Sequence, residues 1–310
     1  MLADDPLVNA HFGHFMPSQE EIELTAQLLS ADPELAVAKE FIVIHGDELA
    51  TLRRFCWQAK QLGVSGRLCA EEALKLLRQC AEKRLKLGLD VILDRPSFPD
   101  ELWSSFIETV PQTYHGLGLR GQPVVLIRAG GTDPSAMGEL LNAGAVHSVD
   151  DVNAAVLCFL RCEECLFRHT VPRASAEVGH LVDRVILIVD LWGVGRGHFR
   201  FATEFLLVAV RQTVILYPET LDHVLVVNAA WSFATLLWPI LKRLLHPVSQ
   251  RKVVIADASR TREKLLEHLG VECLPSHFGG ENEGIRMGCM LRPREPEAVD
   301  SAACRQTKDV

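Results

Sequence analysis

Four short, uninterrupted apolar runs are the feature that most constrains the fold of this 310-residue chain. They are rich in Val and Ile and comprise residues 124–127, 185–189, 224–227 and 253–256. Continuous apolar character without alternation is typical of strands that are covered on both faces, as in a parallel sheet. Helical patterns separate the runs, over residues 149–168, 198–216, 232–245 and 260–269. This order predicts an α/β domain with a largely parallel sheet.

The first third of the chain is predicted to be helical. Ser18 and Glu21 have the spacing of a capping box. A further helix is expected from Asp47, and residues 71–87 form an amphipathic pattern that ends at Gly88, a favourable C-cap. We therefore expect a helical lead-in without an assigned role, a helical module, an α/β domain and a mostly disordered tail, over residues 1–46, 47–112, 113–280 and 281–310.

Composition excludes several classes of protein. A hydrophobic fraction of 48% is too high for a disordered chain, and a net charge of −8 argues against a nucleic-acid partner. Nine Cys and an acidic start without an apolar leader favour a reducing, cytoplasmic location over secretion. Composition does not explain why a chain with 23% charged residues is this apolar.

The longest apolar stretch, residues 224–241, is interrupted by Asn228. Its first part is β-branched and its second part has a helical period, so a strand followed by a helix is favoured over a membrane span. The helix carries an apolar stripe that predicts core packing, formed by Phe233, Leu236, Leu237, Ile240, Leu241, Leu244 and Leu245. Trp231 and Trp238 lie off this stripe. They suit either a membrane interface or a helix placed between two apolar layers, and the pattern alone does not decide.

Two further motifs have ordinary interpretations. Cys158, Cys162 and Cys165, with His169, have spacings that could ligate an iron–sulfur cluster, but they fall on one face of a single helix, which favours core packing. The Gly-rich segment 193–197 follows a strand but lacks the spacing of a phosphate-binding loop. Glu163 and Glu164 are interpreted as a solvated pair. We expect no catalytic residues and no metal site.

An ordered set of motifs extends over about residues 47–280. It includes Leu52-Arg53-Arg54-Phe55, Tyr114-His115, Gly179-His180-Leu181-Val182, Asp190-Leu191-Trp192-Gly193, Tyr217-Pro218-Glu219, Val226-Val227-Asn228-Ala229, His246-Pro247-Val248-Ser249 and Leu274-Pro275-Ser276-His277-Phe278-Gly279-Gly280. In this order the motifs resemble the CRAL-TRIO lipid-binding family, in particular its phosphatidylinositol transfer proteins.

The resemblance implies a fold and an activity. A mostly parallel sheet forms the floor of a hydrophobic lipid pocket, and a gate helix after Asn228-Ala229 closes it. The activity is non-enzymatic: one lipid is held and then exchanged at membranes. The residues that the resemblance assigns to the gate or to membrane contact are Trp231, Phe233, Leu236, Leu237, Trp238, Ile240 and Leu241.

The resemblance also implies a headgroup site. Glu219 in the Tyr-Pro-Glu turn, Ser249 and Lys252 match the positions that bind phosphatidylinositol in the family. A carboxylate can accept hydrogen bonds from inositol hydroxyls, and an ammonium can meet the phosphodiester. Val185 and Leu187 stand where family members that also carry phosphatidylcholine have hydroxyl residues. A choline-lipid site is therefore doubtful, and a more apolar second ligand is an alternative.

The chain further departs from the family's pattern in two places. The gate stretch contains Pro239, which could kink the helix. The family's basic run is reduced here to Lys60, because Cys56-Trp57-Gln58-Ala59 precede it.

Taken together, we expect a monomeric cytoplasmic protein, peripherally associated with membranes, that binds and transfers lipid. Its expected partners are a phospholipid ligand, phosphatidylinositol first, and a membrane surface that it touches transiently; no nucleic acid and no cofactor other than the bound lipid are expected. The alternative is a carrier or sensor of another small apolar ligand that does not exchange it. A third hypothesis, an enzyme that uses the glycine loop or the cysteine helix, has the least support.

Overall fold

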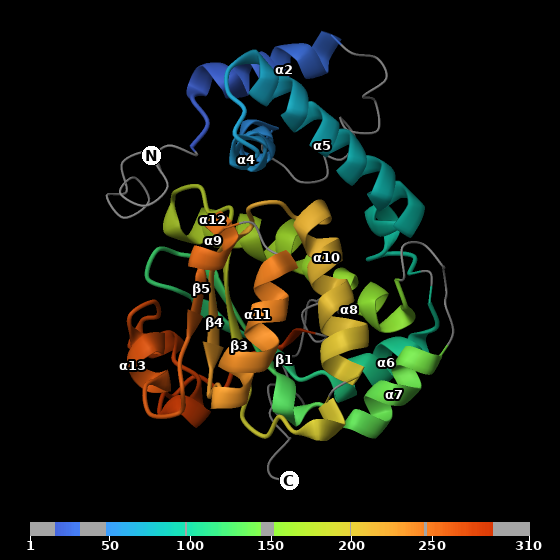
Figure 1. Ribbon diagram of the computed structural model, residues 1–310, viewed down its shortest axis with the longest axis vertical. Helices are drawn as coiled ribbons and strands as arrows, with labels where there is room; N and C mark the ends of the chain where they lie inside the picture. Colours follow the sequence, from blue (N-terminus) through green and yellow to red (C-terminus); the bar gives the residue numbers. More distant parts are fainter. Residues whose placement is uncertain are drawn as a thin grey trace, which may run out of the picture.

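A six-stranded sheet in the order β5-β4-β3-β2-β1-β6 forms the centre of the molecule (Figure 1). The structure is a computed structural model that describes residues 16–31, 48–96, 98–143, 152–198, 200–244 and 247–287. The strands are β1 Gln112–Leu117, β2 Pro123–Arg128, β3 Val185–Asp190, β4 Leu221–Val227, β5 Val253–Ile255 and β6 Ile285–Arg286. Strands β2 to β5 are the four predicted runs, and neighbouring members pair in parallel as predicted.

Strands β1 and β6 were not predicted from the sequence. They pair antiparallel at one edge of the sheet, with Thr113 opposite Arg286 and Tyr114 opposite Ile285. Their polar residues give no continuous apolar run. Residues 281–287, which the sequence placed in the tail, thus include an edge strand; the rest of that tail lies outside the described residues.

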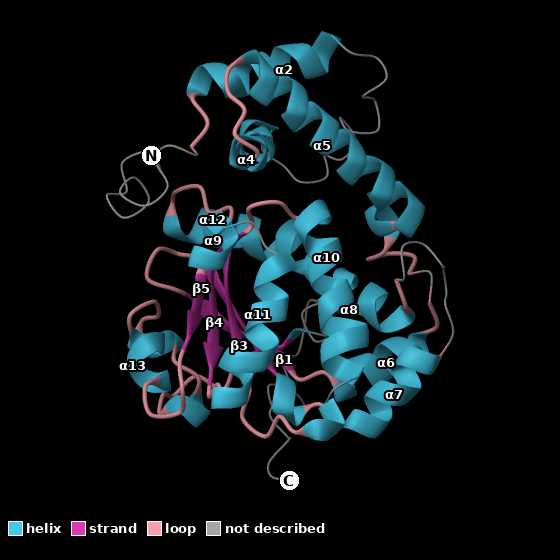
Figure 2. Cartoon of the chain, viewed as in Figure 1, coloured by secondary structure: helices cyan, strands magenta, loops and turns pink. Residues whose placement is uncertain are grey.

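Helices surround the sheet (Figure 2). The α-helices are α2 Gln19–Ala31, α4 Glu48–Gln61, α5 Arg67–Leu87, α6 Asp100–Thr109, α7 Pro134–Asn142, α8 Ala154–Cys165, α9 Val171–Val178, α10 Leu207–Leu216, α11 Trp238–Leu241, α12 Pro247–Arg251 and α13 Thr261–Leu266. Turns of π-helix precede α9, α10 and α11, over Leu166–Thr170, Phe201–Leu206 and Phe233–Leu237. No helix in the described ranges is both long enough and apolar enough to cross a bilayer.

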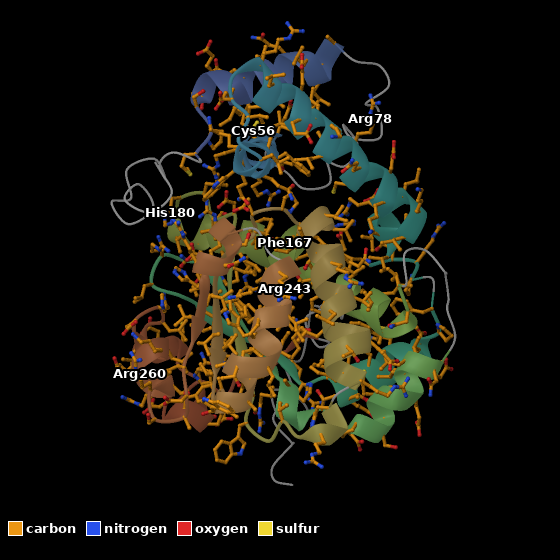
Figure 3. All side chains as sticks on the ribbon, viewed as in Figure 1. Cys56, Arg78, Phe167, His180, Arg243 and Arg260 are labelled. Carbon is orange, nitrogen blue, oxygen red and sulfur yellow. The ribbon has the colours of Figure 1, made fainter. Side chains whose placement is uncertain are left out.

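The helical module is one packed unit formed by α2, α4 and α5. Its core includes Leu29, Leu52, Phe55 and Leu77, and Cys56 is fully buried within it (Figure 3). The predicted capping box is present: Ser18 N–H donates to Glu21 Oε2 at 2.8 Å, and Glu21 N–H donates to Ser18 Oγ at 3.2 Å. Gly88 ends α5 in the left-handed conformation at φ 65°, as predicted. The described part of the lead-in therefore packs with the module that follows it.

The two faces of the sheet are covered unequally. One face packs against α13 and the segment after it, and its side chains are at most 1% exposed: Val124, Leu126, Ile186, Ile188, Leu225 and Val227. The connections from β2 to β3, from β3 to β4 and from β4 to β5 each lead to the next strand in the same direction across the sheet. Because such connections are right-handed, α8, α10 and α11 lie on the opposite face. That face is half-buried at Leu187, Val189, Val224, Val253 and Ile255.

A buried ion pair joins the helical module to the α/β domain. Arg84 at the end of α5 and Glu164 in α8 are both fully buried, and the guanidinium donates from Nη1 and Nη2 to the two carboxylate oxygens at 2.8 Å each. Arg168 contacts Glu164 at 2.7 Å, and the Tyr217 hydroxyl donates to it. Burial opposes the charge on Arg84, but the Glu164 carboxylate outweighs this and raises the Arg84 pKa. The interpretation of Glu163 and Glu164 as a solvated pair is therefore wrong: α5 covers Glu164, and burial together with the Glu164 charge raises the pKa of the half-buried Glu163 to about 8.

The cysteine stripe packs in the core as predicted. Cys158, Cys162 and Cys165 are at most 1% exposed. Burial raises the pKa of Cys158 to about 12 and that of Cys165 to about 11, so both are neutral thiols at neutral pH. His169 is exposed and does not join them. Within the described residues no group of three or more His, Cys, Asp or Glu side chains is arranged to hold a metal ion.

The buried pair generates a stability prediction. Arg84→Met is expected to lower the free energy of unfolding by about 3–5 kcal/mol, because it leaves the Glu164 carboxylate buried with fewer partners. Urea unfolding measures this. The matched control is Glu71→Gln, which removes an exposed partner of Arg67 and is expected to cost less than about 1 kcal/mol. An Arg84→Met change no larger than the control would contradict the role of this pair.

His115 generates a pH prediction. Its side chain is 2% exposed and lies 2.9 Å from Thr113 Oγ1 and 3.1 Å from Asn282 Oδ1. Burial lowers its pKa to about 4, below its value in the unfolded chain, which binds the proton more readily. Below about pH 6.5 the unfolded chain takes up a proton at His115 before the folded chain does. The free energy of unfolding therefore falls by about 3 kcal/mol as the pH falls from about 6.5 toward 4. His115→Gln is expected to reduce the dependence of the free energy of unfolding on pH in this window, as measured by urea unfolding at several pH values. Equal pH dependence in the variant and the native chain would refute the role of His115.

Candidate functional site

Glu219 and Lys252 form a buried ion pair at the N-terminal edge of the parallel strands. Glu219 ends the turn between α10 and β4 with φ 57°, and Lys252 directly precedes β5. Since β4 and β5 are parallel neighbours, residues that precede them meet at one edge. Lys252 Nζ lies 2.6 Å from Glu219 Oε2, and the two side chains are 7% and 5% exposed. The structure thus brings together two of the three predicted headgroup residues.

Helix α4 of the helical module completes this cluster. Gln61 donates from Nε2 to Glu219 Oε1 at 2.6 Å. The Trp57 ring lies 5.2 Å from Lys252 Nζ and 4.4 Å from Arg184 Cζ, within range of cation–π attraction. The sequence analysis did not assign Trp57 and Gln61 to the site, although their i, i+4 spacing places them on one helix face. Residues 56–59, which replace the family's basic run, therefore provide the Trp57 ring as an aromatic surface for Lys252 and Arg184 of the α/β domain.

Charged groups from the module and the sheet surround the pair. Arg53 forms an ion pair with Asp183, and Arg120 lies 2.7 Å from Asp222. Burial lowers the pKa of Lys252; Glu219 opposes this shift and Arg184 adds to it. At Asp222, burial would raise the pKa, but the hydrogen bond from His223 and the nearby Arg120 lower it to about 2. The site is thus a desolvated cluster in which every charge depends on a partner.

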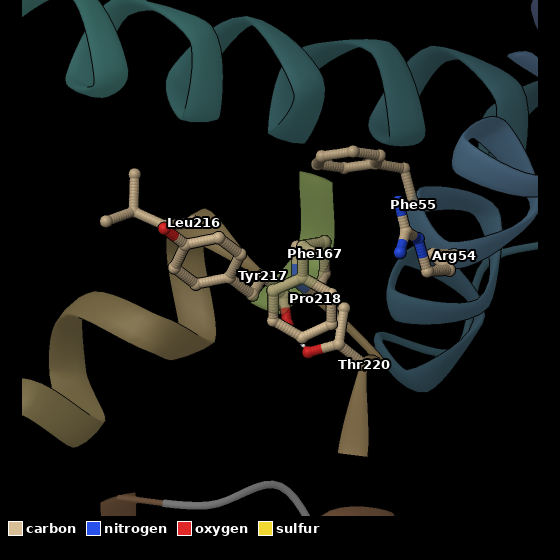
Figure 4. Close-up of a pocket in the computed structure, with 7 residues that line it drawn as sticks. All are labelled: Arg54, Phe55, Phe167, Leu216, Tyr217, Pro218 and Thr220. Carbon is tan, nitrogen blue, oxygen red and sulfur yellow. Dashed lines mark hydrogen bonds between the residues drawn. The ribbon is translucent and has the colours of Figure 1, made fainter. Parts of the chain in front are cut away.

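A small pocket adjoins the cluster between α4 and the Tyr-Pro-Glu turn. Figures 3 and 4 show Phe167 beneath the helical module, facing it across this pocket. The lining residues are Arg54, Phe55, Phe167, Leu216, Tyr217, Pro218 and Thr220, and the cavity volume is about 10 Å³. A cavity of this volume is roughly large enough for one water molecule. This pocket is therefore too small to hold a lipid as it stands.

Ser249 lies in α12, one turn before Lys252. Its carbonyl accepts a hydrogen bond from the Lys252 N–H at 3.1 Å, and the residue is half-buried. Among the described residues, no hydrogen bond connects its hydroxyl to Glu219 or Lys252. The structure thus places the third predicted headgroup residue next to the pair along the chain.

The gate stretch is helical without interruption over residues 231–244, as predicted, but the type of helix changes along it. A π-turn over Phe233–Leu237 leads into α11, and a 3₁₀ turn Lys242–Leu244 follows. Pro239 has no N–H to continue the hydrogen-bond ladder, and a π-turn advances the side chains by less than an α-helix does. The stripe calculated for a regular helix therefore changes direction along the segment.

The exposure of the gate side chains follows from this change of helix type. Trp231 is 79% exposed, Leu236 68% and Ile240 52%, whereas Leu241 is 9% exposed. The prediction that the whole stripe packs in the core is therefore wrong for Leu236 and Ile240. Phe233 and Trp238 are half-buried; the side chains of Leu237 and Leu244 and all of residues 245–246 lie outside the described set. The alternative that places the helix between two apolar layers does not hold at Trp231.

The site generates a prediction about the buried pair itself. Lys252→Met is expected to destabilise the fold by about 3 kcal/mol, because Glu219 loses its counter-ion in a desolvated position. Adding Glu219→Gln is expected to recover most of this loss, since the remaining polar groups are neutral. A double-mutant cycle from urea unfolding measures the coupling. Additive losses would show that the pair is not coupled.

Comparisons with known proteins agree with this architecture. The sequence model of the CRAL/TRIO domain matches residues 107–280. The crystal structure of Sfh5 has the same fold, with a TM-score of 0.59 at 15% sequence identity, over 89% of this chain and 92% of that one. The predicted α/β fold, a helical module followed by a mostly parallel sheet, is confirmed.

Curated relatives share more of the sequence. Phosphatidylinositol/phosphatidylcholine transfer protein SFH7 of Arabidopsis thaliana is 29% identical over 211 residues, which cover 68% of this chain and 36% of that protein. The SEC14 cytosolic factor of Yarrowia lipolytica is 26% identical over 230 residues, covering 73% and 44%. That of Kluyveromyces lactis is 24% identical over 254 residues, covering 77% and 80%.

The share of each protein that is matched differs between the relatives and the family model. The chain spans less than half the length of the Arabidopsis and Yarrowia relatives. The family match itself covers more than half of the 310 residues. This chain belongs to the CRAL/TRIO domain family.

Proposed function

We propose that this protein binds phosphatidylinositol and transfers it between membranes. The observation that carries the proposal is the buried pair of Glu219 and Lys252, 2.6 Å apart at the N-terminal edge of the sheet. The proposal is supported by the family and by relatives that are named as phosphatidylinositol/phosphatidylcholine transfer proteins. Transfer breaks no covalent bond, so the proposed activity needs no catalytic residue and no cofactor other than the lipid.

The pair has the chemistry to recognise an inositol phospholipid. Glu219 can accept hydrogen bonds from ring hydroxyls, and Lys252 can donate to the phosphodiester. In the structure each group satisfies the other, and Gln61 holds the second Glu219 oxygen. A headgroup would replace these internal contacts: ring hydroxyls would donate hydrogen bonds to Glu219, and the phosphodiester would be the counter-ion of Lys252. Ser249 is proposed to add a hydroxyl contact beside Lys252.

The acyl chains are proposed to lie along the less covered face of the sheet. Leu187, Val189 and Val224 are half-buried there, on the face that the gate segment crosses. Burying a chain of about 16 carbons gains on the order of 13 kcal/mol at about 0.8 kcal/mol per CH₂. Since a bilayer offers nearly the same gain, contacts with the headgroup decide which lipid is retained.

The same face argues for phosphatidylinositol over phosphatidylcholine. Val185 and Leu187 have apolar side chains, so neither position offers a hydroxyl to a choline lipid. We propose that any second ligand is more apolar than phosphatidylcholine. The gate residues Trp231, Leu236 and Ile240 are proposed to touch the membrane when lipid exchanges. The proposal places the protein in the cytoplasm as a monomer that associates peripherally with membranes.

Transfer of labelled lipid between vesicles tests the proposal. The native chain is expected to transfer phosphatidylinositol well above the protein-free rate and faster than phosphatidylcholine. Glu219→Gln with Lys252→Met is expected to reduce phosphatidylinositol transfer by about 10- to 100-fold, the equivalent of lost charge-assisted hydrogen bonds. This double variant avoids the unpaired charge of either single variant. Glu71→Gln is the matched control for loss of a surface charge.

Native mass spectrometry of the purified protein completes the test. No transfer together with no bound lipid would refute the proposal. A bound apolar ligand that never exchanges with vesicles would favour the carrier or sensor alternative.

A further inference from the structure

Two exposed Trp side chains lie at the C-terminal edge of the parallel strands. Trp192 follows β3 and is 69% exposed; Trp231 follows β4 and is 79% exposed. Asp190 and Val227, the last residues of the two strands, are paired in register. Both chains therefore leave the sheet side by side, at the edge opposite Glu219 and Lys252. Val194, in the same loop as Trp192, is also exposed.

One buried carboxylate holds both of these loops. Asp190 is 2% exposed, and its Oδ1 accepts hydrogen bonds from the Trp192 N–H at 2.9 Å and from Asn228 Nδ2 at 2.7 Å. Asn228, at φ 51°, also donates its N–H to Thr261 Oγ1 at 3.0 Å, which ties the turn to the start of α13. The positions of Trp192 and of the turn that leads to Trp231 therefore depend on one polar network.

Close backbone packing fixes the Trp192 loop from the other side. A Cβ at Gly130, after β2, would lie 1.8 Å from the Trp192 carbonyl oxygen, so only glycine permits this approach. The loop is thus held between the ends of β2 and β4. The backbone constraints on this loop hold the Trp192 side chain in an exposed position. Exposing a large aromatic side chain to water is unfavourable, so a partner that covers it would be stabilising.

The charges around the two Trp residues indicate the partner. Arg128, Arg196 and Arg262 are exposed near the ends of β2, β3 and β5, and within the described ranges none of them has an ion-pair partner. Asp133 and Asp257, exposed carboxylates in the loops after β2 and β5, accept hydrogen bonds from backbone N–H groups of their own turns. Arg260 lies beside α13 and is paired with Glu263 at 4.0 Å (Figure 3). Aromatic side chains with unpaired arginines are complementary to anionic lipid headgroups.

We propose that the Trp192 loop, residues 191–195, is a second membrane-contacting element and that it docks the C-terminal edge of the sheet, together with Trp231, on an anionic lipid surface. The inference rests on the proposed function, because it names the surface through which lipid exchange takes place. It adds an element outside the gate segment. Its position opposite the Glu219–Lys252 pair allows docking and headgroup binding to be tested separately.

Flotation with vesicles tests the proposal independently of lipid transfer. The probes are vesicles of phosphatidylcholine alone and of phosphatidylcholine with phosphatidylserine. Trp192→Ala is expected to weaken binding to the anionic vesicles by about tenfold, in line with the loss of one buried aromatic side chain. Arg128→Gln with Arg262→Gln is expected to weaken binding to anionic vesicles only. Leu119→Ala, at the opposite edge and 63% exposed in the native chain, is the matched control and is expected to bind normally.

The outcomes separate the two proposals. Normal vesicle binding by Trp192→Ala, or no binding by the native chain, would overturn the docking proposal even if phosphatidylinositol is transferred. Vesicle binding that depends on Trp192, together with no lipid transfer by the native chain, would uphold docking and refute the proposed function. Far-ultraviolet circular dichroism and thermal unfolding confirm that each variant is folded, and Trp192→Phe is expected to restore most of the binding.

Discussion

The arrangement of the molecule depends on the buried contact of Arg84 with Glu164. It joins α5 to α8, and Glu164 also accepts the hydroxyl of Tyr217, two residues before Glu219. The position of the helical module and that of the Tyr-Pro-Glu turn are therefore set by the same carboxylate. Desolvation offsets much of the attraction in a buried ion pair, but an arrangement that separated the partners would leave Glu164 buried without Arg84, so the contact favours the observed position of the module. Only this arrangement brings Trp57 and Gln61 of α4 against Lys252 and Glu219.

Parallel strands give the two edges of the sheet different roles. The N-terminal edge carries the desolvated cluster around Glu219 and Lys252, which the helical module covers. The C-terminal edge carries the Asp190 network and two exposed Trp side chains. The chain from β4 to β5 must return from the second edge to the first, so the gate segment crosses the half-buried face. Its helix changes from π to α to 3₁₀ along the segment, and Trp231, Leu236 and Ile240 are exposed, which are features expected of a segment with low local stability.

The success of the sequence-based predictions varied with the kind of pattern. Strands β2 to β5 were predictable because burial on both faces demands continuous apolar runs. Strands β1 and β6 were not, because polar residues such as Gln112 and Thr113 interrupt any apolar run in β1, and β6 is only two residues long. The prediction that Leu236 and Ile240 pack in the core was wrong, because a regular helical period does not describe a π-turn followed by Pro239. The prediction that Glu164 is solvated was wrong, because the local sequence does not indicate that an arginine 80 residues away pairs with it in the core.

The sequence by itself determined the parallel sheet, the helical module, the packing of the cysteine stripe and the family resemblance that singled out Glu219 and Lys252. These follow from local periodicity and from ordered motifs, which are properties of neighbouring residues. Only the tertiary structure decided that Trp57 and Gln61 complete the headgroup cluster and that Asp190 holds the Trp192 and Asn228 loops together. Those contacts join segments far apart in the chain, and the desolvation that makes each partner necessary exists only after the elements have packed.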